Sequence, residues 1–62
     1  MNIEVYRKYT IGSIVIVDNE PETVFRSVDW FTIKNGTIYG NMNGEELTIH
    51  MDMYNYNYRF SA

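Results

Sequence analysis

The stretch FTIKNGTIYG, residues 31–40, carries the clearest structural signal in this 62-residue chain. Its centre is Asn35-Gly36, the preferred pair for a type I′ turn, because both turn positions need a positive φ and the resulting twist matches that of the flanking strands. Phe, Thr, Ile and Tyr, which favour strands, lie on both sides of this pair. The stretch therefore predicts a β-hairpin.

Two further strands are predicted before this hairpin. Residues 3–11 alternate apolar with polar side chains, which is the period-two pattern of a half-buried strand, although Arg7 interrupts the apolar parity. Residues 13–18 contain four consecutive β-branched side chains, and this run predicts a central strand covered on both faces. Gly12 and a turn at residues 19–22 bound this second strand.

After the hairpin, Asn43-Gly44 predicts a second tight turn, and residues 47–60 predict a long final strand. The apolar parity of that strand changes after Met53, and a similar change occurs near Trp30. Such a slip turns every later side chain to the opposite face unless a bulge or bend absorbs it. We therefore expect two long strands that bend.

The predicted fold is all-β, a single small antiparallel meander of about five curved strands that becomes a small barrel if its edges meet. The alternative is an α+β fold with one short helix near residues 22–31. Val24, Val28 and Phe31 in this region fit helical spacing, whereas its frequent β-branched residues favour a strand. Residues 1–62 are expected to form one domain, since domains begin at about 50 residues.

The composition narrows the possible partners. The formal net charge is −3, with scattered basic residues, and this argues against broad binding of a phosphate backbone. The sequence contains no Cys, no secretory signal and no stretch long enough to span a membrane, so we expect a cytoplasmic protein with no membrane partner. Asn, Ile and Tyr, which have AT-rich codons, are abundant while Ala occurs once, and this points to a low-GC bacterium or its phage.

The residues for catalysis are missing from the sequence. There is no Cys, there is one His, and the Ser residues lie in no nucleophile motif. The four Gly residues are scattered and form no phosphate-binding loop. We therefore predict that the protein is not an enzyme, with no catalytic residue, cofactor or small-molecule substrate.

Two groups of side chains resemble metal sites only in part. His50 and Asp52 share one face of the predicted final strand, but a typical zinc site needs three or four ligands. Asp18, Glu20 and Glu22 surround a turn that lacks the glycine-centred loop of an EF-hand. The preferred interpretations are a solvated strand face and an exposed acidic turn, so no metal ligand is predicted.

The alternating Tyr and Asn residues near the C-terminus are the candidate interface. Three interpretations stay open: a core face with solvated Asn opposite, a protein interface, and an aromatic platform on which the bases of a single-stranded nucleic acid stack. The acidic balance disfavours nucleic acid. The predicted interface residues are Tyr54, Asn55, Tyr56, Asn57, Tyr58 and Arg59.

The sequence thus favours a non-enzymatic, acidic β-domain that acts by binding protein, as an accessory or inhibitory protein of a phage or mobile element. The favoured partner is a second copy, because a small open sheet leaves an unpaired edge and a chain this short buries little surface alone. The final strand, with its Tyr-Asn alternation and few charges, is the edge predicted to pair with another chain. One alternative is a single-stranded nucleic-acid binder that uses the Tyr-rich face. The other is a structural subunit of a larger assembly.

Overall fold

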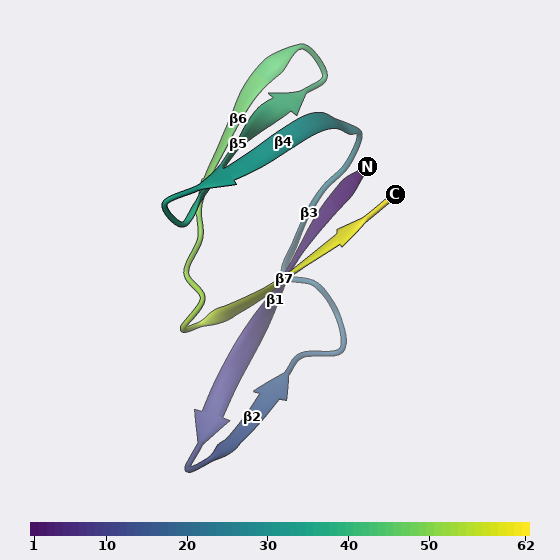
Figure 1. The fold of residues 1–62 in the computed structure, drawn as a ribbon. Coiled ribbons are helices and arrows are strands. Elements are labelled where there is room, and N and C mark those ends of the chain that lie inside the picture. The colour runs from purple at the N-terminus through teal and green to yellow at the C-terminus, as the bar shows by residue number, and fades with distance from the viewer.

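The computed structural model describes residues 1–62 and contains strands but no helix (Figure 1). The all-β prediction is therefore confirmed. The strands are β1 (Asn2–Ile11), β2 (Ile14–Val17), β3 (Thr23–Phe25), β4 (Val28–Lys34), β5 (Thr37–Met42), β6 (Glu45–His50) and β7 (Tyr56–Ser61).

The first sheet is built around β1, its longest strand. All its pairings are antiparallel: β7 pairs with residues 2–7 of β1, β3 pairs with residues 3–5, and β2 pairs with residues 8–11. The amide of Asp18 donates to Arg7 O, and the amide of Glu22 donates to Val5 O, so β2 and β3 follow one edge of β1 in succession. β7 occupies the opposite edge.

The second sheet contains β4, β5 and β6 in that order, and both of its connections are tight turns. Asn35 and Gly36 have φ values of 50° and 72°, and Asn43 and Gly44 have φ values of 54° and 81°. Positive φ at both central residues is the type I′ geometry predicted from the Asn-Gly pairs. The two sheets are linked at one corner, where the amide of Val28 donates to Met1 O over 2.8 Å.

The two predicted long strands are interrupted, which explains why there are seven strands and not about five. The first is the strand favoured for residues 22–31 and its continuation into the hairpin at residues 31–34; its break lies at Ser27, whose φ is 59°, and a bulge follows between Val28 and Trp30. The break in residues 47–60 is a turn after β6. Both breaks are close to the parity changes in the sequence. The single meander is therefore corrected to two small sheets that do not close into a barrel.

The alternative with a helix near residues 22–31 is wrong. This region contains β3 and the start of β4. Its β-branched residues lose side-chain freedom in a helix, and the edge of β1 offers their backbone a hydrogen-bonding partner. Pairing with β1 therefore prevails over the helical spacing.

The core is small and lies between the two sheets. Ile3, Val28, Ile38 and Leu47 form its buried cluster, against which Tyr58 and other partly buried side chains pack. Ile3 and Ile38 are completely buried. Because each buried aliphatic side chain contributes about 1.5–3 kcal/mol, this cluster supplies much of the stability of a short chain.

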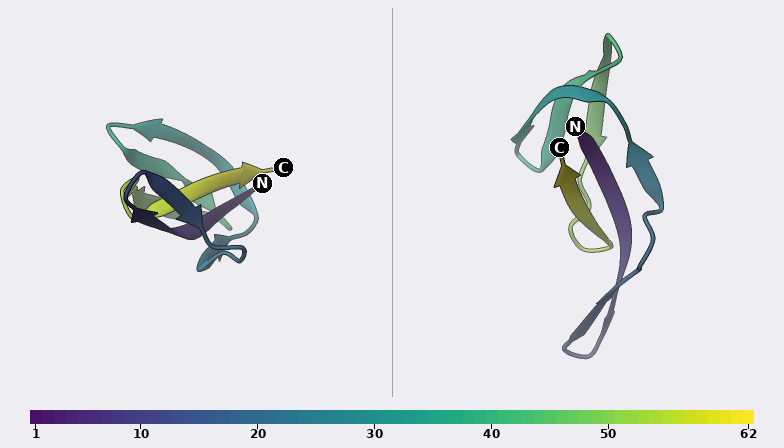
Figure 2. Two further views of the ribbon diagram at one scale, coloured as in Figure 1. Left: turned by 90° about the horizontal axis from the view of Figure 1, so that it is seen from below. Right: turned by 90° about the vertical axis from the view of Figure 1, so that its right-hand side faces the viewer.

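Beyond the core, the β1–β2 hairpin extends away from the body of the molecule (Figures 1 and 2). The structure measures 42 × 24 × 15 Å, and its radius of gyration is 12.5 Å, against about 10.6 Å for a compact chain of this length. Its exposed surface is 4611 Å², against about 4,200 Å² for a compact monomer of this mass. The projecting hairpin accounts for the elongated shape.

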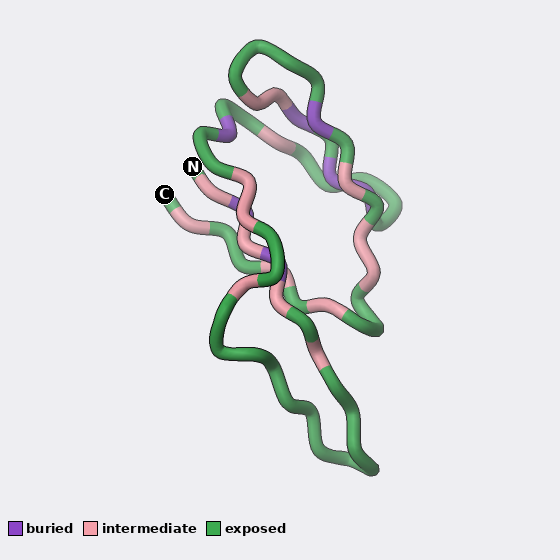
Figure 3. The backbone as a smooth tube through the Cα atoms, turned by 180° about the vertical axis from the view of Figure 1, so that it is seen from behind, coloured by how far each residue is buried: buried purple, intermediate pink, exposed green.

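The prediction that residues 13–18 form a central strand covered on both faces is wrong. All four residues of β2 are exposed (Figure 3). β2 pairs with β1 alone, since the chain then returns along the same edge as β3 and no other strand reaches the outer edge of β2. The second sheet covers only the end of β1 that contains Ile3.

Candidate functional site

The candidate site is the projecting hairpin, which we define as residues 8–17: the second part of β1, the turn Gly12-Ser13 and β2. Gly12 has a φ of 61°, whereas Ser13 does not have a positive φ. This is the type II′ pattern, which requires Gly at the first turn position and suits a two-residue connection between twisted strands. The local sequence therefore produces a tight, regular hairpin.

One face of the projecting hairpin is apolar and lies on the same side of the sheet as the core, with Arg7 between the two. Tyr9 is paired with Ile16, and Ile11 is paired with Ile14. Because side chains alternate along a strand, these four lie on the same side of the sheet as Ile3. Ile3 is completely buried, whereas Ile11 is 64% exposed. The apolar face thus extends beyond the sheet that covers it.

The opposite face and the outer edge of β2 are also uncovered. Val15 and Val17 are exposed. Asp18 is hydrogen-bonded to Arg7 through its amide, and bonded and non-bonded positions alternate along an antiparallel pair. The backbone N–H and C=O groups of Ile14 and Ile16 therefore point to β1, and those of Val15 and Val17 point outward.

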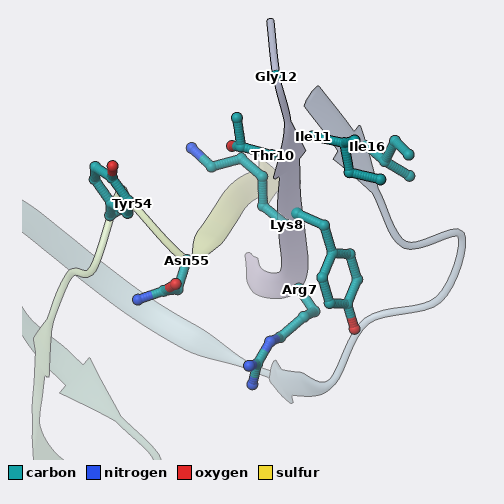
Figure 4. A pocket seen from close by; sticks show the side chains of 9 residues that line it. Arg7, Lys8, Thr10, Ile11, Gly12, Ile16, Tyr54 and Asn55 are labelled. Carbon is teal, nitrogen blue, oxygen red and sulfur yellow. The ribbon is translucent and has the colours of Figure 1, made fainter. Parts of the chain in front are cut away.

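An open groove of about 740 Å³ runs beside the projecting hairpin, and the turn before β7 borders it (Figure 4). Arg7 lies in this groove, with its guanidinium 5.9 Å from the ring centroid of Tyr9 and 5.5 Å from that of Tyr56. Lys8 donates through Nζ to Met53 O. These contacts attach the base of the hairpin to the turn.

Asp52 organises that turn. Its Oδ1 accepts hydrogen bonds from the amides of Tyr54 and Asn55, each over 3.1 Å, and its Oδ2 accepts from Asn55 Nδ2 over 2.8 Å. The hydrogen bond from the Asn55 side chain is the largest cause of a lowered pKa at Asp52, followed by that from the Asn55 amide. Bonds to the charged form favour ionisation, so the turn and the carboxylate stabilise each other.

The six predicted interface residues do not form one surface. The Tyr54 side chain is 86% exposed beside the groove, and Asn55 lies next to it. Tyr56 and Tyr58 are half-buried, and Tyr58 packs against the core while its hydroxyl accepts from the Asp52 amide over 2.9 Å.

The remaining two predicted residues belong to another surface. Asn57 and Arg59 are exposed on β7 and border a shallow depression with Val17 and Asp18. Arg59 Nε lies 4.0 Å from Glu4 Oε1, a surface pair that contributes at most about 1 kcal/mol. Some of the six residues therefore pack against the body of the protein and others are exposed. Tyr54, Tyr56 and Tyr58 do not form one row on which successive bases could stack.

The two groups of side chains that partly resembled metal sites form other contacts. His50 Nδ1 lies 3.3 Å from Thr37 Oγ1, and Asp52 is occupied by backbone amides. No three His, Cys, Asp or Glu side chains come close enough to hold a metal ion. Asp18 and Glu20 border an open depression after β2.

The residues that sequence reasoning missed are Tyr9, Ile11, Ile14 and Ile16, because alternation alone does not show whether another sheet covers them. The absence of charge in residues 9–17 does not single them out, because residues 35–44 of the second sheet are also uncharged.

No family model matches the chain, and no curated protein and no solved structure is significantly similar to it. The structure contains no helix with the length and apolarity needed to cross a membrane.

Proposed function

We propose that this chain is a non-enzymatic protein-binding module and that the projecting hairpin is its binding surface. The observation that carries the proposal is the apolar face of the hairpin, which lies on the same side of the sheet as the core but stays exposed. Exposed contiguous apolar surface on a small domain is typical of an interaction site. The module acts by occupying its partner's surface, since no cluster of reactive side chains lies beside the hairpin.

The composition supports the setting that we propose for this module. A small acidic chain without cysteine suits the reducing cytoplasm. Its abundance of residues with AT-rich codons suits an accessory or inhibitory protein of a phage or mobile element.

Site-specific photo-crosslinking in the producing cell tests the proposal. A crosslinking amino acid at Ile14, on the hairpin, is expected to form protein adducts. The same amino acid at Ile33, which is 48% exposed on the second sheet, is the control and is expected to form few. Equal yields from the two sites, or no adduct from Ile14, would show that the hairpin is not the binding surface.

A second candidate function is binding of single-stranded nucleic acid in the groove beside the hairpin. Arg7, Lys8, Tyr9 and Tyr54 line this groove and combine positive charge with aromatic rings. The net charge of −3 opposes the binding of a nucleic acid. Arg7 and Lys8 are also hydrogen-bonded already, to Tyr56 and to Met53. Fluorescence anisotropy with a labelled oligonucleotide at low salt distinguishes the two, because the protein-binding proposal predicts no change in anisotropy.

A further inference from the structure

We infer that the partner of the projecting hairpin is a second copy of the same chain, joined through antiparallel pairing of the two β2 edges. This inference rests on the proposed function and specifies the partner and the register. It starts from the outer edge of β2, where Val15 and Val17 direct unpaired backbone groups outward. An edge of this kind is a template for another strand.

The edge is short, at four residues, but it carries no side chain or bulge that prevents such pairing. Natural edge strands are usually protected by charged side chains, proline or bulges. β2 consists of Ile14, Val15, Ile16 and Val17, with no charge, proline or bulge. Other edge strands carry charges in contrast: β6 begins with Glu45 and Glu46, β4 contains Asp29 and Lys34, and β7 contains Arg59. β2 is therefore the edge suited to pairing.

The outward groups determine a two-fold register. Val15 of one copy is opposite Val17 of the other, so that each pair exchanges two backbone hydrogen bonds. The axis then passes between the two Ile16 residues, which face each other as a non-hydrogen-bonded pair with Cα atoms about 4.5 Å apart. Such an isologous contact closes as a dimer and leaves no free β2 edge.

The charge distribution permits a second copy as the partner. The chain is acidic overall, but residues 9–17 carry no charge, so the hairpin fits an uncharged apolar surface such as its own. In the proposed register the two Asp18 residues are offset by four positions, or about 13 Å, which exceeds a Debye length of about 8 Å at physiological salt. The acidic residues after β2 therefore do not oppose the pairing.

The dimer also covers apolar surface that one copy leaves exposed. Tyr9, Ile11, Ile14 and Ile16 of the two copies would form one continuous face across the joined sheet, with Ile16 at its centre. For a chain of this length, burial between copies supplies stability that its own small core cannot.

Disulfide trapping tests the register, because the natural chain has no cysteine. Ile16→Cys is expected to form a covalent dimer with oxidised glutathione, since its Cα separation across the axis suits a disulfide. Val15→Cys is expected to form little dimer, because the two Val15 positions would be about 8–9 Å apart, beyond the reach of a disulfide. Ile33→Cys controls for random collision, because Ile33 is 48% exposed and Ile16 is 46% exposed.

Sedimentation of the unmodified chain completes the test, with an expected mass of about twice 7.4 kDa. Equal trapping at all three cysteine positions, together with a monomeric mass, would overturn the inference. If that happens, photo-crosslinking from position 14 to a different protein would still support the proposed function. The absence of any crosslinked protein would overturn both the proposed function and this inference. Circular dichroism of each variant verifies that it is folded.

Discussion

At the scale of single residues, two positions in the structure have environments that permit little change. Gly40 lies opposite Phe31 beside the bulge in β4, where the chains approach closely. Asp52 holds the turn before β7 through its carboxylate. Neither role is evident from sequence periodicity, because both depend on backbone that is distant in the sequence or irregular.

Gly40→Ala is expected to destabilise the protein by about 1–3 kcal/mol, the typical cost of overpacking. A Cβ at this position would collide with the carbonyl oxygen of Trp30, and the backbone cannot move aside as a flexible side chain can. Urea unfolding measures the change. Thr48→Ala, at an exposed site on β6, is the control and is expected to change stability by less than about 0.5 kcal/mol. Equal effects would show that the close approach at Gly40 is not a constraint.

The pKa of Asp52 is lowered from its ordinary value of 3.8, chiefly by the hydrogen bond from the Asn55 side chain. Its contribution to stability is therefore fully present above pH 3.8 and is lost as the pH falls through the lower folded-state pKa. In a plot of melting temperature against pH, Asp52→Asn is expected to lack the decrease that this carboxylate causes at acid pH. Asp29→Asn, also exposed and of the same charge change, is the control. A wild-type pH profile in the Asp52 variant would contradict this role.

At the scale of elements, β1 has two halves with different surroundings. Its first half contains Ile3, which is completely buried under the second sheet. Its second half pairs with β2 and is uncovered on both faces. The same alternation of side chains therefore builds the core at one end of the strand and an exposed apolar face at the other.

This difference predicts contrasting effects of one chemical change. In dilute samples of the monomer, Ile3→Val is expected to lower the free energy of unfolding by about 0.5–1.5 kcal/mol, because a buried methylene is removed. Ile14→Val is expected to change it by less than about 0.5 kcal/mol, because that side chain is exposed in the monomer. Denaturant titration measures both. A larger loss at Ile14 would show that the hairpin is covered within a single copy.

The elements also show how far the sequence predicts this structure. The two Asn-Gly turns require positive φ, a local property, so they could be identified correctly. The bends were also foreseeable, because the parity changes near Trp30 and after Met53 mark them. The exposure of β2 was not, because Ile-Val-Ile-Val fits a buried central strand and an unprotected edge equally well. For the same reason the sequence pointed to a different candidate site, the Tyr-Asn alternation near the C-terminus. Of its residues only Tyr54 and Asn55 line the groove beside the projecting hairpin.

At the scale of the whole molecule, the fold is a small two-sheet body with a projecting arm. The body buries few side chains, and its surface exceeds that of a compact monomer of equal mass by about 400 Å². Residues 9–17 of the projecting hairpin carry no charge, and its outer strand, β2, lacks a neighbour. Shape, charge and backbone pairing thus all indicate an arm that is completed by association.

The most direct measurement is amide hydrogen exchange of the unmodified chain, followed residue by residue by NMR at increasing protein concentration. The amides of Val15 and Val17 are expected to become protected as the concentration rises, because they donate across the two-fold axis. The amides of Glu46 and Thr48, on the free edge of β6, remain unprotected. Rapid exchange at Val15 and Val17 at every concentration would contradict the pairing of β2 with a second copy.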